Sequence, residues 1–124
     1  MRLLTRNQSR RLDQVSMEKL GIPGLRLMEN AGKKVAEVSK SILEGKKRER
    51  QIAICCGKGN NGGDGFSAAL HLDHFNVTVF SLPTISDILG DSLHFYNKCV
   101  EKGIKLVHGN ELPTSKEFDL IIDG

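Results

Sequence analysis

Three polar side chains lie inside a glycine-rich segment, GKGNNGGDG, at residues 57–65. Asn60, Asn61 and Asp64 carry amide and carboxylate groups, which can bond to sugar hydroxyls or bind a hard cation. The surrounding glycines allow a tight turn and a close approach of backbone N–H groups to phosphate oxygens. Asn and Asp are also frequent in ordinary turns, but three of them in one loop favour a ligand site. The segment therefore predicts an anion-binding loop, most simply for the phosphates of a nucleotide.

The spacing of Gly57, Gly59 and Gly62 matches the G-x-G-x-x-G pattern of dinucleotide-binding loops. Ordinary dinucleotide folds place an acidic residue about 20 residues further on, where it binds a ribose hydroxyl. Residues 80–83, Phe-Ser-Leu-Pro, contain no such acid. The segment also lacks the G-K-[ST] ending of a P-loop. The sequence therefore argues against a simple dehydrogenase and against a P-loop nucleotidase.

The elements that must position this segment alternate between strand and helix. Short apolar stretches predict four strands, at residues 51–56, 77–80, 104–107 and 118–123. Helical periodicity predicts two helices between them, at about 66–74 and 85–100. This alternation is typical of a mostly parallel sheet in a three-layer, Rossmann-like, doubly wound α/β fold. We expect the fourth strand to pair beside the first, so that Asp123 emerges next to the glycine segment at the switch point of the sheet.

Two helices are expected ahead of the sheet, at about residues 5–20 and 25–45. The second has apolar residues at three- and four-residue steps, namely Leu27, Met28, Ala31, Val35, Val38 and Ile42. We predict a single domain at residues 1–124, with leading helices at 1–45 and the sheet part at 51–124. A chain of 124 residues is long enough for one modest core.

Composition excludes several classes of protein. No apolar run approaches the roughly 20 residues that cross a bilayer, and no secretory signal is visible, so we expect a cytoplasmic protein without membrane contact. Three cysteines, an odd number without the paired spacing of a zinc site, predict reduced core thiols. The basic first half has no aromatic residue before Phe66, so it lacks the stacking surfaces of single-strand binders, and we expect no nucleic-acid partner.

Three strings in this chain resemble the NAD(P)H-hydrate epimerase family, whose domain is also called YjeF N-terminal. They are CGKGNNGGDGF at 56–66, LMENAG at 27–32 and DLIID at 119–123. The resemblance covers the whole chain but only the amino-terminal part of the family's domain, so it implies a fold truncated at the carboxyl end. Within the family pattern, the N-N-G-G-D core is the most specific feature.

The resemblance implies an enzyme of nicotinamide nucleotide repair, which interconverts the R and S forms of hydrated NADH and NADPH. A partner, NAD(P)H-hydrate dehydratase, then restores the cofactor from the S form. By the same resemblance, the residues that bind the substrate are Asn60, Asn61, Gly62, Gly63 and Asp64. A potassium ion is implied as well, with Asn61 and Asp123 among its ligands, and oxygen donors of this kind suit a hard cation. A homodimer is also expected.

Two other readings of the sequence stay open. Related domains serve as non-catalytic nucleotide-binding or dimerising scaffold modules, although the intact motif favours an enzyme. The catalytic acid and base are not identified by the sequence, because epimerisation requires proton donors and acceptors around the nicotinamide C6 hydroxyl and the matching residues only bind. The other reading is a fragment: the family's second glycine loop and a later segment with another substrate-binding Asp have no counterpart in this sequence, so activity of the 124-residue chain itself stays open.

Overall fold

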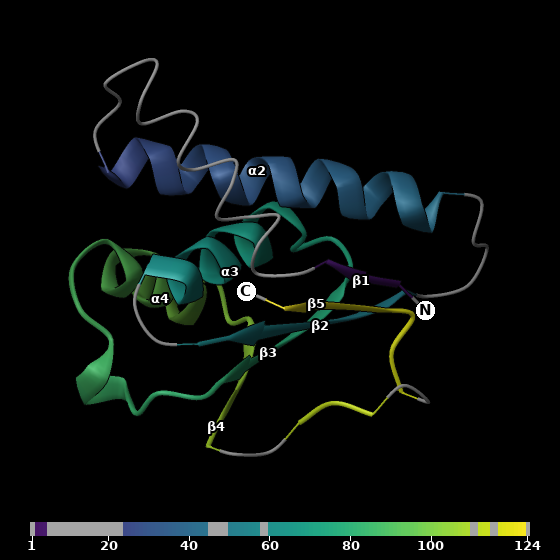
Figure 1. Cartoon of the computed structure of the whole chain (residues 1–124). Coiled ribbons are helices and arrows are strands. Elements are labelled where there is room, and N and C mark those ends of the chain that lie inside the picture. The colour runs from purple at the N-terminus through teal and green to yellow at the C-terminus, as the bar shows by residue number, and fades with distance from the viewer. Residues whose placement is uncertain are drawn as a thin grey trace.

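The computed structural model describes residues 2–4, 24–44, 50–57, 60–109, 112–114 and 117–123. Its sheet has five strands, β1 (Arg2–Leu4), β2 (Gln51–Cys56), β3 (Asn76–Ser81), β4 (Lys105–His108) and β5 (Leu120–Asp123). Their order is β1-β5-β2-β3-β4, and every neighbouring pair is parallel. The predicted pairing of the last strand beside the first predicted strand is therefore confirmed, since β5 lies against β2 (Figure 1).

Three helices and one short turn complete the described part of the chain. They are α2 (Gly24–Leu43), α3 (Asn60–His71), the 3₁₀ turn η1 (Ile85–Asp87) and α4 (Gly90–Glu101). Figure 1 shows α3 and α4 on one face of the sheet, with α2 lying outside α3. The connection from β4 to β5 crosses the opposite face, where the ring of Phe118 packs edge-on against Phe80 at 5.9 Å. The predicted α/β fold with a parallel sheet is confirmed.

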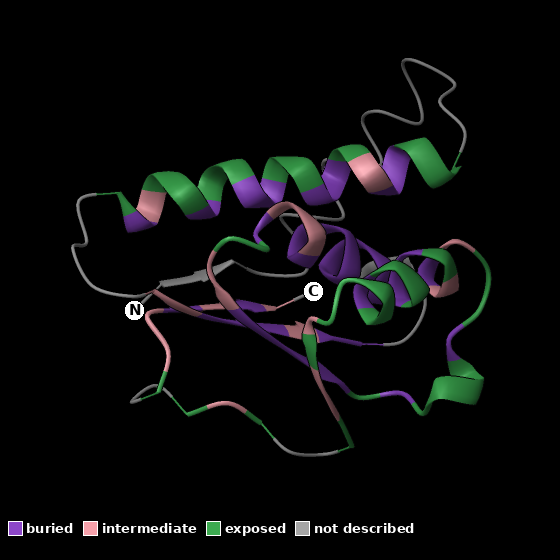
Figure 2. Ribbon diagram, turned by 180° about the vertical axis from the view of Figure 1, so that it is seen from behind, coloured by how far each residue is buried: buried purple, intermediate pink, exposed green. Residues whose placement is uncertain are grey.

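The core lies between the sheet and the helices. β2 is buried on both faces, so Ile52, Ala53 and Ile54 are each 0% exposed. Such a strand reads as a continuous apolar run because neither face meets water. Figure 2 shows buried residues along the sides of α2 and α3 that face one another and the sheet. This buried interior holds the carboxyl end of β2 and the start of α3 in fixed positions.

The buried face of α2 differs slightly from the predicted one. Leu27, Met28, Ala31 and Val35 are buried as expected. Val38 is 38% exposed, so its predicted place on the buried face was wrong. The buried face of α2 instead includes the small residues Gly32, Ala36 and Ser39 and ends at Leu43. Small residues here let α2 approach α3 closely.

The helix predicted at 85–100 is interrupted. Ile85–Asp87 forms the separate turn η1, and α4 starts only at Gly90. Leu89 is extended (φ −127°, ψ 161°), and Gly90 has φ +60°, which glycine adopts without strain. Leu89 is therefore 72% exposed instead of lying on a buried helical face.

Two further findings concern the first 20 residues. β1 was not predicted, and it adds a fifth strand at residues 2–4 beside β5. The helix predicted at about 5–20 lies outside the described residues.

Within the described part of the chain, no helix combines the length and apolar character needed to cross a membrane.

The three cysteines are free thiols, as predicted, with Cys56 and Cys99 buried and Cys55 half-buried. Burial raises the pKa of Cys99 to about 12, and burial also raises the pKa of Cys56 well above its usual range. The pKa of Cys55 is raised first by burial and then by the nearby charge of Asp123. Because the thiolate is the nucleophile, none of these groups is activated.

We therefore expect iodoacetamide to label the native protein only slowly at pH 8, first at Cys55, and to label all three cysteines after unfolding. Intact-mass spectrometry over time measures this directly. Rapid labelling of Cys56 in the native protein would contradict the burial described here.

Candidate functional site

The glycine-rich motif forms the start of a helix. α3 begins at Asn60, so N-N-G-G occupies its first turn and Asp64 follows directly, and the predicted loop through residue 65 was too long. The reason is tertiary packing. A side chain on Gly62 would overlap the carbonyl oxygen of Gly57, and a Cβ on Gly65 would lie 2.5 Å from the sulfur of Cys56. Glycine at these positions lets α3 pack directly against the end of β2.

Gly63 likewise allows close packing of α3, here against α2 and α4. A Cβ on Gly63 would overlap the sulfur of Met28 on α2 and would lie 2.6 Å from Oγ of Ser92 on α4. The first turn of α3 is therefore enclosed by a strand end and two helices. Such close packing favours a preorganised binding site.

The electrostatics at this helix start favour an anion. The first N–H groups of a helix have no partner within the helix, and the aligned peptide dipoles add positive charge there. The first turn of α3 contains no acidic residue that would offset this charge. Because the turn follows β2 at the carboxyl edge of a parallel sheet, it can bind a phosphate group in the way that nucleotide-binding folds do.

Asp64 is a buried carboxylate directly after this turn. It is only 2% exposed, and its charge is one of the causes that raise the pKa of Cys56, after burial and the other cysteines. Burying a carboxylate is costly for a protein, and such groups concentrate at functional sites. Asp64 is thus the strongest described candidate for a polar group with a role beyond packing.

Asp123 ends β5 at the same edge of the sheet. Its register partner on β2 is Cys55, two residues before Gly57. The structure therefore brings Asp123 to the strand end from which the glycine segment leaves. The side chains of Asn60 and Asn61 lie outside the described residues, so the distance between Asn61 and Asp123 is not among the described contacts.

The side chains at this edge of the sheet can be compared with the ligands that a bound cation requires. Within the described residues, no three His, Cys, Asp or Glu side chains lie close enough together to hold a metal ion. Asp123 offers carboxylate oxygens, which suit a hard monovalent or divalent cation and not a soft one. A potassium ion would therefore fit the chemistry of this edge only with amide and backbone oxygens completing its shell.

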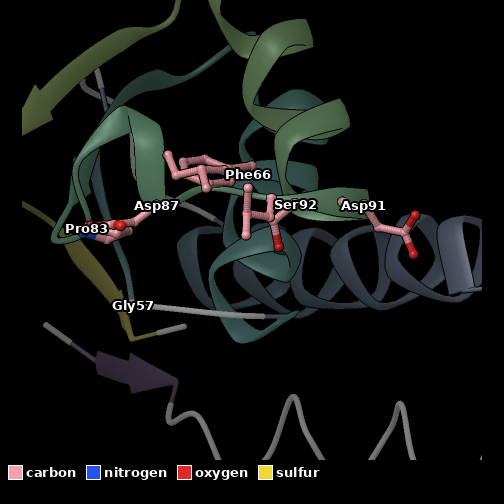
Figure 3. A pocket seen from close by; sticks show the side chains of 9 residues that line it. Gly57, Phe66, Pro83, Asp87, Asp91 and Ser92 are labelled. Carbon is pink, nitrogen blue, oxygen red and sulfur yellow. The ribbon is translucent and has the colours of Figure 1, made fainter.

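A cavity of about 440 Å³ opens at this edge, between the end of β2 and the start of α4 (Figure 3). It is lined by Gly57, Phe66, Pro83, Asp87, Ile88, Leu89, Gly90, Asp91 and Ser92. Two carboxylates thus border the space next to the glycine segment. Neither carboxylate could be recognised from the sequence, because a ribose-binding acid is expected near residues 80–83 and the periodicity at 85–100 predicts one continuous helix.

The rim of this cavity is ordered by local hydrogen bonds. Oγ1 of Thr84 donates to Oδ2 of Asp87 at 2.8 Å and lies 3.1 Å from Oγ of Ser86. At the back of the cavity, Phe66 is 1% exposed and packs edge-on against Tyr96 at 5.4 Å. The hydroxyl of Tyr96 lies 3.0 Å from Nε2 of His108, at the end of β4. The cavity wall is therefore anchored in the core.

Comparison with known proteins gives the family. Residues 24–124 match the family model described as YjeF-related protein N-terminus. The chain is 34% identical over 129 residues to an NAD(P)H-hydrate epimerase of Rhodopirellula baltica, covering 98% of this chain and 50% of that protein. It is 37% identical over 132 residues to a bifunctional NAD(P)H-hydrate repair enzyme Nnr of Moorella thermoacetica, covering 99% of this chain and 25% of that protein.

A solved structure supports the fold. The crystal structure of yeast ynu0, YNL200c, superposes with a TM-score of 0.66 at 21% identity, covering 89% of this chain and 48% of that one. The chain spans half or less of these three relatives. On the match of residues 24–124, the chain belongs to the family of YjeF-related protein N-termini.

Proposed function

We propose that this protein epimerises the R and S forms of hydrated NADH and NADPH, and so acts as an isomerase in nicotinamide nucleotide repair. The observation that carries the proposal is the N-N-G-G-D segment at the start of α3, beyond the carboxyl end of β2. A relative that shares this part of the chain is named an NAD(P)H-hydrate epimerase. Both observations favour a dinucleotide as the ligand.

In this proposal the backbone of Gly62 and Gly63 holds the phosphates of the substrate at the positive end of α3. Asn60 and Asn61 bind the substrate's hydroxyl groups through their amides. Asp64 completes the substrate site as a buried carboxylate. Inversion at C6 of the hydrated nicotinamide requires a proton donor and a proton acceptor near that carbon, and Asp64 is the described group most suited to such a role.

A potassium ion belongs to the same proposal, with Asn61 and Asp123 among its ligands. Its chemistry would be that of a fixed positive charge, which stabilises negative charge on the bound nucleotide. The residues of this chain would hold the ion and orient the substrate, and the ion would supply only its charge. Support comes from the oxygen-only donor set and from the place of Asp123 at the edge where the glycine segment begins.

The partners follow from the reaction. We propose that an NAD(P)H-hydrate dehydratase consumes the S form, and relatives named bifunctional repair enzymes are consistent with such coupling. We further propose that residues 1–124 form one domain, that the protein is a homodimer, and that it works in the cytoplasm.

An assay coupled to an S-specific dehydratase tests the potassium site. With R-hydrated NADH as substrate, we expect NADH to form faster in potassium than in sodium. Asn61→Ala and Asp123→Ala should abolish this difference, because each removes an oxygen ligand. Asn97→Ala and Asp73→Ala change exposed residues away from this edge and should keep it. Equal rates in both salts for the unmodified protein would show that the potassium assignment is wrong.

A further inference from the structure

The cavity beside the glycine segment carries two carboxylates whose surroundings differ. Asp91 lies against the start of α2, since a Cβ on Gly24 would be 2.7 Å from its Oδ2. Figure 3 shows its carboxylate pointing away from the other labelled residues of the cavity. Asp91 also lies in the first turn of α4. Its negative charge therefore lies at the starts of α2 and α4, where a carboxylate stabilises a helix.

Asp87 faces a different environment. It lies in η1 next to Pro83, on the side of the cavity where β2 ends at Gly57 (Figure 3). The hydroxyl of Thr84 holds its Oδ2 at 2.8 Å, so the carboxylate has a defined orientation. In doubly wound folds, the acid that binds the adenosine ribose follows the second strand of the nucleotide-binding unit. Asp87 also follows β3, the strand after β2, although it lies further along the chain.

The start of α3 and the cavity beside it differ in charge. α3 has no acidic residue in its first turn, whereas the first turn of α4 has Asp91. None of the described residues that line the cavity is a lysine or an arginine. A phosphate is thus favoured at α3, while the charged side chains that line the cavity, Asp87 and Asp91, are both carboxylates. Hydroxyl groups suit these carboxylates, and a further phosphate does not.

The apolar part of the cavity suits a flat ring. Ile88 is buried, and Leu89 next to it is 72% exposed at the rim. An exposed leucine beside a concave surface gains most when a ligand covers it. A purine base resting on these two side chains would place its ribose toward Asp87.

We propose that this cavity binds the adenosine part of the substrate and that Asp87 selects an unphosphorylated ribose, so that the hydrated form of NADH is preferred over that of NADPH. Asp87 accepts hydrogen bonds from the ribose hydroxyls. In the phosphorylated cofactor a 2′-phosphate would meet this carboxylate, and like charges in close contact disfavour binding. The inference rests on the proposed function, because it assumes a dinucleotide substrate at this edge.

Calorimetric titration with adenosine 5′-monophosphate and with adenosine 2′,5′-bisphosphate tests this selection without catalysis. At low ionic strength, where charges are least screened, we expect the monophosphate to bind roughly tenfold more tightly or better. Asp87→Asn keeps an acceptor for Thr84 but removes the charge, and should bring the two affinities within about threefold of each other. Asp73→Asn, an exposed acid paired with Lys102 away from the cavity, should leave the ratio unchanged.

Tighter binding of the bisphosphate, or an unchanged ratio in Asp87→Asn, would overturn the assignment. Absence of binding by both nucleotides would overturn it as well, even if the protein epimerises hydrated NADH. Conversely, selective binding of the monophosphate in a protein without epimerase activity would refute the proposed function and leave the adenosine site in place.

Discussion

Replacing Gly32 by alanine is expected to lower the free energy of unfolding by about 3 kcal/mol. Gly32 lies where α2 crosses α3, and a Cβ there would overlap Oγ of Ser67 and lie 2.5 Å from its Cβ. It would also lie 2.6 Å from the backbone nitrogen of Ala68, which cannot rotate away. The two helices would have to separate. At an exposed helix position the same change stabilises a protein by up to about 1 kcal/mol. A loss of stability in Gly32→Ala would therefore itself indicate that the two helices are closely packed.

Urea unfolding followed by circular dichroism measures this effect. Lys33→Ala, at the exposed neighbouring position, is the matched control and should change stability by no more than about 0.5 kcal/mol. The double variant Gly32→Ala with Ser67→Gly should recover only part of the loss, because the contact with Ala68 remains. A Gly32→Ala protein as stable as the unmodified one would mean that α2 does not pack on α3 at this distance.

Replacing Asp64 by asparagine should lower kcat/KM for epimerisation roughly a hundredfold or more, the usual contribution of a group that moves a proton. Asparagine has the same shape as aspartate but can neither carry the charge nor exchange the proton. Asp64 is 2% exposed and directly follows the turn that is proposed to hold the phosphates. No other described carboxylate combines such burial with this position.

The comparison requires equally folded proteins. Urea unfolding of Asp64→Asn should be run in parallel, and rates should be compared at a temperature where both proteins are folded. Asp73→Asn is the matched control, since Asp73 is exposed at the turn after α3. Full activity in a folded Asp64→Asn protein would remove Asp64 from the site.

Much of the fold could be predicted because its signals are local. The apolar run at 51–56 is typical of a strand covered on both faces, and β2 is that strand. The three- and four-residue steps after Leu25 predict one long helix, and α2 spans Gly24–Leu43. The pairing of β5 with β2 followed from the topological rules for parallel sheets.

The remainder depends on packing that the sequence does not display. Glycine has poor helix propensity, so the segment at 57–65 predicted a loop, yet α3 is helical from Asn60 and its glycines pack closely against Gly57, Cys56 and Met28. The break before α4 was hidden because Ile85 and Leu89 fit a helical period by chance. β1 is only three residues long and carries too little pattern to be recognised.

The position of Asp123 relative to the glycine segment could be predicted, whereas the place of Asp87 could not. The glycine segment and Asp123 were expected at one edge of the sheet, and the strand register places them there. Asp87 was not predicted because a ribose-binding acid was expected no further along the chain than the end of the strand. An acid within a short turn a few residues beyond a strand, preceded by Thr84, is a signal that could have identified it.

The most direct test is to incubate pure R-hydrated NADH with the protein in potassium buffer and to separate the two epimers by chromatography. We predict that the R form is converted to the equilibrium mixture, at a rate proportional to the protein concentration. The same mixture should be reached from the S form. An R fraction that falls no faster than in buffer alone would contradict the proposal that the turn at the start of α3 belongs to an epimerase site.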